Sequence, residues 1–373
     1  MVKRILVTST DLMMVQFLLP HIKNLSDNGY QVDIACSDVG GRMGEIRDEL
    51  SSIVSEIHVV RLLRSPASIK NLQGYFDVKT VIKAKHYDII WTNEPVMGVV
   101  TRLAARHTRK KGTKVIYMTH GFHFFVGAPK LNWLIYYPIE KILSRFSDMI
   151  IAINHEDYKI AKKFHAKDVR YIHGIGVNSD RLNIETMKTN IRDELKLPDT
   201  AFLLLSAGEL NDNKNHSIIL RALKLLKDES IHYLICGKGE LLEQLQKFTR
   251  DLKIEKQVHF LGYRKDVVEI CAQADIFLFP SHREGLGLAP LEAMYSGLPL
   301  ITSRIRGPQD FMEDGRTGFM CDPDDELAFM QAIKQLKTND ELRIRCGLHN
   351  KNVVIPFLLD NVKNEILKIF NTL

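Results

Sequence analysis

The sequence predicts an α/β protein with two doubly wound, parallel-sheet domains that face each other across a cleft. Short apolar runs alternate with helical patterns through all 373 residues, an order typical of parallel sheets covered by helices on both faces. The polar stretch 178–200 separates two such series, and the chain is long enough for two domains that each bury a core. Because open parallel sheets bind ligands at the carboxyl ends of their strands, we expect the ligand in the cleft.

The apolar runs are the predicted strands of two Rossmann-like domains. The first domain, residues 1–178, should contain KRILVT, QVDIAC, IHVV, DIIW, KVIYM and MIIAI, and the second, residues 179–353, should contain FLLLS, HYLIC, VHFL, IFLF and LPLIT. Residues 354–373 carry apolar positions at helical spacing around Pro356. This spacing predicts a last helix that packs back on the first domain.

The composition is that of a soluble globular protein, with 45% hydrophobic and 26% charged residues. No apolar run approaches the roughly 20 residues that span a bilayer. The start MVKRILVTST fits a first strand better than a signal peptide, since its apolar run is short and is soon followed by Asp11. We therefore expect a cytoplasmic protein.

The five cysteines are scattered, with neither a C-x-x-C pair nor a cluster with histidine at metal-ligand spacing. Cys36 and Cys236 end apolar strands and are expected to be small buried hydrophobic residues. The pattern predicts reduced thiols and no structural metal.

The charge is uneven along the chain. Residues 1–178 contain 25 lysines and arginines against 16 aspartates and glutamates, and the remaining residues contain 26 against 29. The basic half should prefer an anionic partner. It lacks a recognition-helix or aromatic RNA-binding pattern, so nucleic acid is not expected. An anionic membrane surface suits the basic stretch 103–114 and the mixed aromatic and basic stretch 130–146, although the second is equally compatible with a core-packed helix.

The segment REGLGLAPLEAMYSG, residues 283–297, places Glu284 in a glycine-rich loop and Glu292 inside a predicted helix. Pro290 suits the first helical position, which puts Glu292 in the first turn. The free amides of that turn favour a phosphate, and the glycines let a ligand approach the backbone. The two carboxylates are suited to accept hydrogen bonds from sugar hydroxyls. Spacing alone is equally compatible with a first-turn helix acid and a solvated loop acid.

Four loops of the second domain follow predicted strands and should meet at one sheet edge. The loop after FLLLS carries Gly208 and Lys214, and the loop after HYLIC carries Gly237. The loop after VHFL carries Tyr263 and Arg264, and the loop after IFLF carries the two glutamates. Lysine can place a point charge on a diphosphate, and the glycines can admit a ligand. Taken singly, none of these loops is specific.

Together, and in this order, the four loops resemble the family 4 retaining glycosyltransferases, which have the GT-B fold. The resemblance covers nearly the whole chain, and its most specific element is the E-x7-E signature formed by Glu284 and Glu292 within EGLGLAPLEAMYSGLP. It implies that Glu292 holds the donor ribose and that Glu284 touches the transferred sugar. It also implies that the amides near Gly287 and Leu288 meet the diphosphate, and that Lys214 is the family's phosphate lysine.

The same resemblance assigns further positions. Tyr263 and Arg264 match the region that borders the nucleotide base, with Gly208 and Gly237 in the neighbouring donor-binding loops. In the first domain His120, within MTHGFHFFVGAP, matches the histidine placed beside the sugar. For His120 the alternative is a strand-end histidine satisfied by backbone groups, and His123 is a weaker candidate for the same site.

Two departures from the family pattern stand out. Many members carry an arginine at the position of Glu209, so one diphosphate contact is missing, and Arg264 or Arg306 is a candidate to replace it. The first loop, expected within residues 8–20, lacks the paired glycines common there.

The resemblance implies transfer of a hexosyl or N-acetylhexosaminyl group, with retention, from a nucleotide diphosphate donor such as a UDP-sugar. The segments MTHGFHFFVGAP and NWLIYYPIEK are similar in sequence to segments of bacterial enzymes that build capsular polysaccharide or exopolysaccharide. The expected acceptor is therefore a polyprenyl-diphosphate-linked saccharide bound by the first domain, at the inner face of the plasma membrane. No metal or other cofactor is expected. The alternatives are a UDP-sugar 2-epimerase and a non-catalytic nucleotide-sugar-binding subunit.

Overall fold

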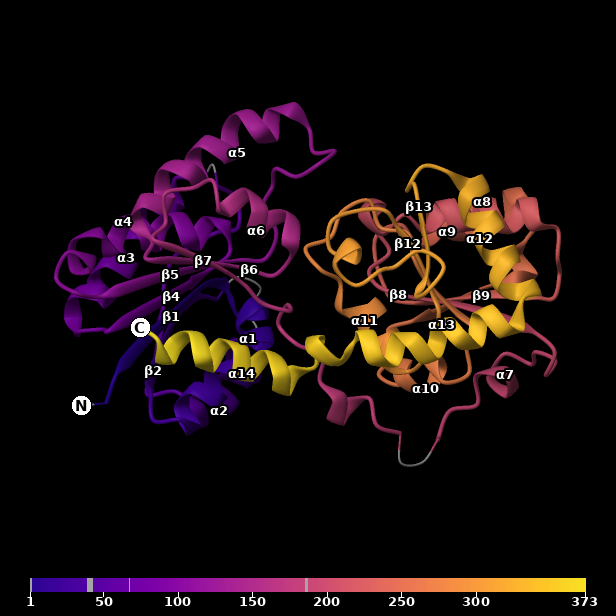
Figure 1. Cartoon of the computed structure of the whole chain (residues 1–373), viewed down its shortest axis with the longest axis horizontal. Helices are drawn as coiled ribbons and strands as arrows, with labels where there is room; N and C mark the ends of the chain where they lie inside the picture. Colours follow the sequence, from indigo (N-terminus) through magenta and orange to yellow (C-terminus); the bar gives the residue numbers. More distant parts are fainter. Residues whose placement is uncertain (1, 39–42, 67, 185–186) are drawn as a thin grey trace. The chain divides into compact units, whose positions relative to one another are not determined.

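The computed structural model describes residues 2–38, 43–66, 68–184 and 187–373. The chain forms two compact units, the first from Met1–Gly176 and Asp360–Leu373 and the second from Val177–Leu359 (Figure 1). The first unit is thus built from both ends of the chain. The five cysteines are free and buried.

The first unit contains a seven-stranded sheet in the order β3-β2-β1-β4-β5-β6-β7. Every pairing is parallel, and the central strands are buried because helices cover both faces. The strands are β1 (Arg4–Asp11), β2 (Gln31–Ser37), β3 (Glu56–Val59), β4 (Ile89–Asn93), β5 (Lys114–Thr119), β6 (Met149–Ala152) and β7 (Asp168–Tyr171).

The helices of the first unit alternate with its strands, as the pattern predicts. They are α1 (Leu12–Asp27), α2 (Met43–Ile53), α3 (Lys70–Ala84), α4 (Pro95–Arg109), α5 (Lys130–Leu143) and α6 (His155–Ala161). The last helix, α14 (Leu359–Asn371), returns to this unit, where Phe370 packs edge-on against Trp91 with ring centroids 5.3 Å apart. Pro356 lies before α14 in a short 3-10 turn of the second unit.

The second unit contains a six-stranded parallel sheet in the order β10-β9-β8-β11-β12-β13. Its strands are β8 (Phe202–Ala207), β9 (Ile231–Cys236), β10 (Val258–Gly262), β11 (Ile276–Phe279), β12 (Leu300–Ser303) and β13 (Gly318–Cys321). Its helices are α7 (Ile191–Glu194), α8 (His216–Leu226), α9 (Leu242–Leu252), α10 (Val267–Cys271), α11 (Leu288–Tyr295), α12 (Glu326–Thr338) and α13 (Asp340–Val353).

All the predicted strands are present, and the two-sheet α/β fold class is confirmed. Two strands, β7 and β13, were not predicted. Each lies at an edge of its sheet, where one side has no neighbour, and their sequences DVRY and GFMC are only partly buried. A partly buried edge strand needs no continuous apolar run, so it gives no strong sequence signal.

The predicted first loop is absent. Strand β1 continues to Asp11, paired with β2 through an irregular register after Ser9, and α1 begins at the next residue. The Asp11 carboxylate accepts a hydrogen bond from the Met14 amide at 3.4 Å and so caps the helix start. A strand that passes directly into a helix leaves no room for a glycine-rich loop, which agrees with the absence of paired glycines from residues 8–20.

Candidate functional site

The loops after β8 and β11 meet because these strands are neighbours in the second sheet. Lys214 ends a 3-10 turn after β8, and its Nζ lies 2.6 Å from Oε1 of Glu284, in the loop after β11. The same ammonium lies 4.8 Å from the ring centroid of Phe279. The fold therefore brings the predicted phosphate lysine and the predicted sugar-binding glutamate into one ion pair.

One of the predicted donor-binding glycines, Gly237, is required by the packing of these loops, and a second, Gly208, leaves room for a neighbouring side chain. A Cβ at Gly237 would lie 1.7 Å from the carbonyl oxygen of Gly208, so no side chain fits there. A Cβ at Gly208 would lie 3.3 Å from Cε of Lys214. The glycines keep the loops after β8 and β9 in contact and leave room for the lysine stem.

Helix α11 begins at Leu288, two residues earlier than predicted. Gly287 precedes it with φ of 94°, a left-handed conformation that glycine adopts without strain. Pro290 is thus the third helical residue and Glu292 the fifth, so the prediction that Glu292 lies in the first turn is wrong. The amides of Leu288 and Ala289 remain available at the helix start, and an anion is favoured beside them.

Glu292 carries a carboxylate that nothing in the described part of the chain holds by a hydrogen bond or ion pair. Partial burial raises its pKa, and the charge of Arg181 acts in the opposite direction. A carboxylate that has lost water without gaining a partner is poorly satisfied. Ligand hydroxyl groups would supply the missing hydrogen bonds.

The loop after β10 contributes the exposed ring of Tyr263 and the guanidinium of Arg264, which already forms ion pairs. Tyr263 is 70% exposed. Arg264 binds Glu194 through two hydrogen bonds of 2.7 and 3.0 Å and also binds Asp266. Its guanidinium is already neutralised, so the geometry does not favour Arg264 as the substitute for the missing family arginine.

Arg306 lies closer to the predicted site. Its side chain is buried, and Nε donates to the carbonyl oxygen of Glu284 at 3.2 Å. Glu209, at the position of the missing arginine, is exposed and accepts a hydrogen bond from Asn211 at 2.9 Å. Of the two candidate substitutes, Arg306 is the one that contacts the glutamate loop.

In the first unit, His120 follows β5 directly, as predicted. Its Nε2 lies 3.1 Å from Oδ1 of Asn93, and the Asn93 amide donates to the carbonyl oxygen of Thr8 at 3.4 Å. This orientation of Asn93 makes Nε2 of His120 the donor and leaves Nδ1 as an acceptor. Burial lowers the pKa of His120 to about 4, so the ring is neutral near pH 7.

A cavity of about 450 Å³ opens in the first unit beside the ends of β1 and β4. The predicted His123 lines it, with its ring tilted by 33° against that of Tyr136 and the ring centroids 4.9 Å apart. So does Glu94, which the sequence analysis did not single out. The available signal was an acid between the end of an apolar strand and a proline at a helix start, in IIWTNEP.

Comparison with known proteins decides the family. Residues 187–353 match the family model described as glycosyl transferases group 1, and residues 6–154 match the model described as glycosyl transferase 4-like. A putative glycosyltransferase of Bacillus subtilis, EpsD, is 36% identical over 100% of this chain and 97% of its own length. The chain belongs to the group 1 glycosyltransferases of family 4.

Other relatives of this glycosyltransferase are more distant. An Escherichia coli enzyme named UDP-Gal:alpha-D-GlcNAc-diphosphoundecaprenol alpha-1,3-galactosyltransferase is 26% identical over 95% of this chain and 88% of its own. Anabaena Alr3699/HepE, solved with UDP, superposes with a TM-score of 0.82 and 18% identity over 100% of both chains. Sucrose-phosphate synthase of Thermosynechococcus elongatus superposes with a TM-score of 0.78 and 17% identity over 99% of this chain and 98% of its own. These likenesses identify the GT-B fold.

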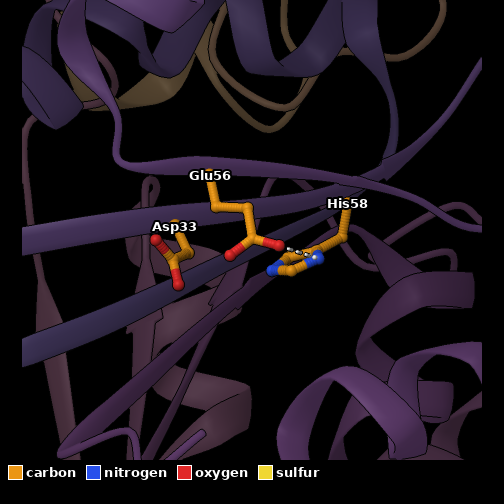
Figure 2. Close-up of side chains that lie close together, drawn as sticks. All are labelled: Asp33, Glu56 and His58. Atoms are coloured by element: carbon orange, nitrogen blue, oxygen red, sulfur yellow. Dashed lines mark ion pairs between the residues drawn. The ribbon is translucent and has the colours of Figure 1, made fainter. Parts of the chain in front are cut away.

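Within the described residues of the glycosyltransferase, Asp33, Glu56 and His58 offer ligand atoms close enough for one metal ion (Figure 2). Nδ1 of His58 lies 3.4 Å from Oε1 of Glu56. However, the Lys85 ammonium binds Glu56 and lies 3.1 Å from Oδ2 of Asp33, which also accepts from Tyr87. Its positive charge lies among the carboxylates, and the hydrogen bond from Lys85 lowers the pKa of Glu56. The cluster is therefore an ion-pair network between β2, β3 and the residues before β4.

No helix in the described ranges of the glycosyltransferase is long and apolar enough to cross a bilayer.

Proposed function

We propose that this glycosyltransferase transfers a hexosyl or N-acetylhexosaminyl group from a UDP-sugar to a polyprenyl-diphosphate-linked saccharide, with retention at the anomeric carbon. The observation that carries the proposal is the Lys214–Glu284 ion pair, in the loop that leads into the first-turn amides of α11 and to Glu292 on that helix. It offers positive charge for a diphosphate and carboxylates for hydroxyl groups. The acceptor class is supported by the name of the Escherichia coli relative.

The proposed reaction breaks the bond between the anomeric carbon and the diphosphate oxygen and forms the bond to an acceptor hydroxyl on the same face. Lys214 and the α11 amides stabilise the charge that develops on the departing diphosphate. A diphosphate oxygen takes the acceptor proton, so no protein nucleophile is needed. Glu292 holds the ribose, Glu284 accepts a hydrogen bond from a sugar hydroxyl, and Nδ1 of neutral His120 accepts a hydrogen bond from a sugar hydroxyl.

The test is acceptor-dependent release of UDP. Wild-type protein is offered UDP-glucose, UDP-galactose and UDP-N-acetylglucosamine in turn, with and without a polyprenyl-diphosphate-linked N-acetylglucosamine. We expect at least one donor to release UDP only with the acceptor and to give a product with the donor's anomeric configuration by NMR. An epimerase would instead convert the donor without acceptor, and a binding subunit would bind UDP without turnover.

No metal is proposed to take part, so turnover should persist in EDTA. The positive groups of the site are Lys214 and the α11 amides, and the Asp33–Glu56–His58 cluster is already neutralised by Lys85. UDP release is measured before and after chelation. A loss of activity that added magnesium restores would contradict this expectation.

Substitution of Glu284 and substitution of Glu292 should have different kinetic effects. The ribose does not change during the reaction, so Glu292→Gln should chiefly weaken donor binding, by about 1.5–3 kcal/mol for a lost charged hydrogen bond. Glu284 contacts the reacting sugar in this proposal, so Glu284→Gln should lower kcat more than it raises the donor KM. Steady-state kinetics of both variants, with melting curves as a folding check, separate the two roles. If both variants have near-wild-type kinetics, neither glutamate takes part in the proposed mechanism.

We also propose that the first unit docks on an anionic membrane surface through α5. Glu140 and Leu143 on one side of this helix are buried, whereas Leu131 and Leu134 are 62% and 74% exposed. Lys141 is among the basic residues on the same helix. Exposed apolar residues with neighbouring lysines are typical of helices that lie in a membrane interface.

Vesicle sedimentation tests this docking. Binding to vesicles with anionic lipid should weaken with salt, because surface charges are screened over about 10 Å at 0.1 M. Leu134→Glu should reduce binding, while Leu327→Glu, an exposed leucine of the second unit, serves as the matched control. Equal binding to neutral vesicles would show that attraction between the basic residues and anionic lipid does not drive the docking.

A further inference from the structure

Glu94 adopts a backbone conformation that residues with side chains rarely adopt. It directly follows β4 and precedes α4, whose first residue is Pro95, and its φ and ψ are 64° and 158°. This region of conformational space is essentially reserved for glycine. Strain of this kind persists only where the surrounding structure holds it, and it is concentrated at functional sites.

The Glu94 side chain is held at the end of β1. Its Oε2 accepts hydrogen bonds from the Ser9 hydroxyl and the Thr10 amide, both at 2.7 Å. Burial raises its pKa, and the charge of Asp11 acts in the same direction. Arg64 pairs with Asp11, and no lysine, arginine or histidine in the described part of the chain forms an ion pair with Glu94. Two hydrogen bonds thus fix this carboxylate at the end of β1, and the charge of Arg64 is felt there without an ion pair.

This carboxylate lines the cavity of about 450 Å³, a volume within the range of about 300–1,000 Å³ found for small-molecule sites. Apolar side chains form most of its wall, and polar groups enter at a few places. Such a wall suits a sugar ring, whose C–H faces pack on apolar side chains while its hydroxyls seek acceptors. The apolar lining residues include Met14, Val96, Val99 and Ile139.

The charges in the cavity argue against a phosphate. Both Glu94 and Glu140 are acids, and the cationic Arg64 is already paired with Asp11. Glu140 is itself paired with Arg102, at 2.8 Å. A neutral, hydroxyl-bearing group fits these surroundings better than the diphosphate of either substrate.

We infer that Glu94 binds the acceptor, accepting a hydrogen bond from a hydroxyl of the acceptor saccharide whose ring occupies this cavity. The inference rests on the proposed transferase function and adds the acceptor-binding group to it. This role explains the strained backbone of Glu94, because that conformation directs the carboxylate into the cavity from the end of β4.

Steady-state kinetics with the polyprenyl-diphosphate-linked N-acetylglucosamine, at fixed saturating UDP-sugar, test the inference. Glu94→Gln keeps an oxygen for Ser9 and Thr10 but removes the charge. It should raise the acceptor KM on the order of 10- to 100-fold, as expected for the loss of a hydrogen bond to a charged group. Val99→Phe, which adds bulk to the cavity from α4, should raise it too. Glu49→Gln, on the exposed face of α2, is the control.

Calorimetry with UDP separates this inference from the proposed function. The variants should bind UDP as the wild type does. If the wild type releases no UDP with any donor, the proposed function fails; if it turns over and both cavity variants keep the wild-type acceptor KM, the assignment of Glu94 fails. Glu94→Gly guards against a folding defect, because glycine accepts the φ of 64° without strain: its melting temperature should be kept while its acceptor KM rises.

A pH profile gives an independent readout. The wild-type acceptor KM should rise as the pH falls through the pKa of Glu94, because the protonated carboxyl is a poorer acceptor, and the glutamine variant should lack this rise. An unchanged profile in the variant would assign the titration to another group and contradict the inference. The other charged or titratable groups around Glu94 are Asp11, Cys36, Arg64, Arg102, His120, His123 and Glu140.

Discussion

Replacing Lys214 by alanine should lower kcat on the order of 100- to 1,000-fold, the usual loss when one group that stabilises a developing negative charge is removed from an active site. The ammonium lies at the carboxyl edge of the second sheet, 2.6 Å from Glu284. In the proposed reaction it stabilises the negative charge of the departing diphosphate. Initial rates of UDP release at saturating donor and acceptor measure the effect.

The Lys214–Glu284 ion pair complicates this experiment, and a second variant resolves it. Lys214→Ala also leaves the partly buried Glu284 carboxylate without its cation, so the loss of rate includes the effect of breaking the ion pair. The double variant Lys214→Ala/Glu284→Gln removes that secondary effect. If its rate returns close to that of Glu284→Gln alone, the lysine acts only by holding the glutamate, and its proposed role on the diphosphate is wrong. Lys247→Ala, an exposed lysine on α9, should be near wild type.

Glu140→Gln should destabilise the first unit by about 3–5 kcal/mol, because it leaves a fully buried arginine without its partner. Nη2 of Arg102 lies 2.8 Å from Oε2 of Glu140, and the guanidinium carbon lies 4.0 Å from the Tyr117 ring centroid. The pair joins α4 to α5. Urea unfolding followed by tryptophan fluorescence reports on this unit, since the two tryptophans, Trp91 and Trp133, both belong to it.

The matched double variant Arg102→Met/Glu140→Leu should recover most of the lost stability, because apolar residues of similar volume can replace a buried pair at little cost. Glu49→Gln again serves as the exposed control. A Glu140→Gln loss below about 1 kcal/mol, the usual size for an exposed pair, would show that water reaches the guanidinium and that α5 is anchored in another way.

The sequence by itself determined the two-sheet architecture. The predicted strands are continuous apolar runs, since a strand covered on both faces must be apolar throughout. The edge strands β7 and β13 lack a neighbour on one side and are only partly buried, and they were not predicted. Partial burial alone does not hide a strand, because the edge strand β3 is also partly buried and was predicted from its apolar run IHVV.

The sequence also placed Lys214, Glu284, Glu292 and His120 after the ends of strands, because motif order and strand ends can be read along the chain. It did not give the start of α11. That boundary depends on Gly287, whose φ of 94° suits glycine and where a Cβ would lie only 3.0 Å from the Phe279 ring. A proline that suits the first position of a helix is also tolerated within the first turn, so Pro290 alone could not decide it.

Only the tertiary structure decided which charged side chains are neutralised by ion pairs within the protein and which face a cavity where a ligand can bind. Arg264, a candidate by position, is neutralised by Glu194, which lies 70 residues away in sequence. Glu94, unremarkable in sequence, is fixed by Ser9 and Thr10 from a neighbouring strand and faces a cavity. Ion pairs and cavities are made by residues distant along the chain, and their electrostatic energies depend on distances and burial that only the folded chain sets.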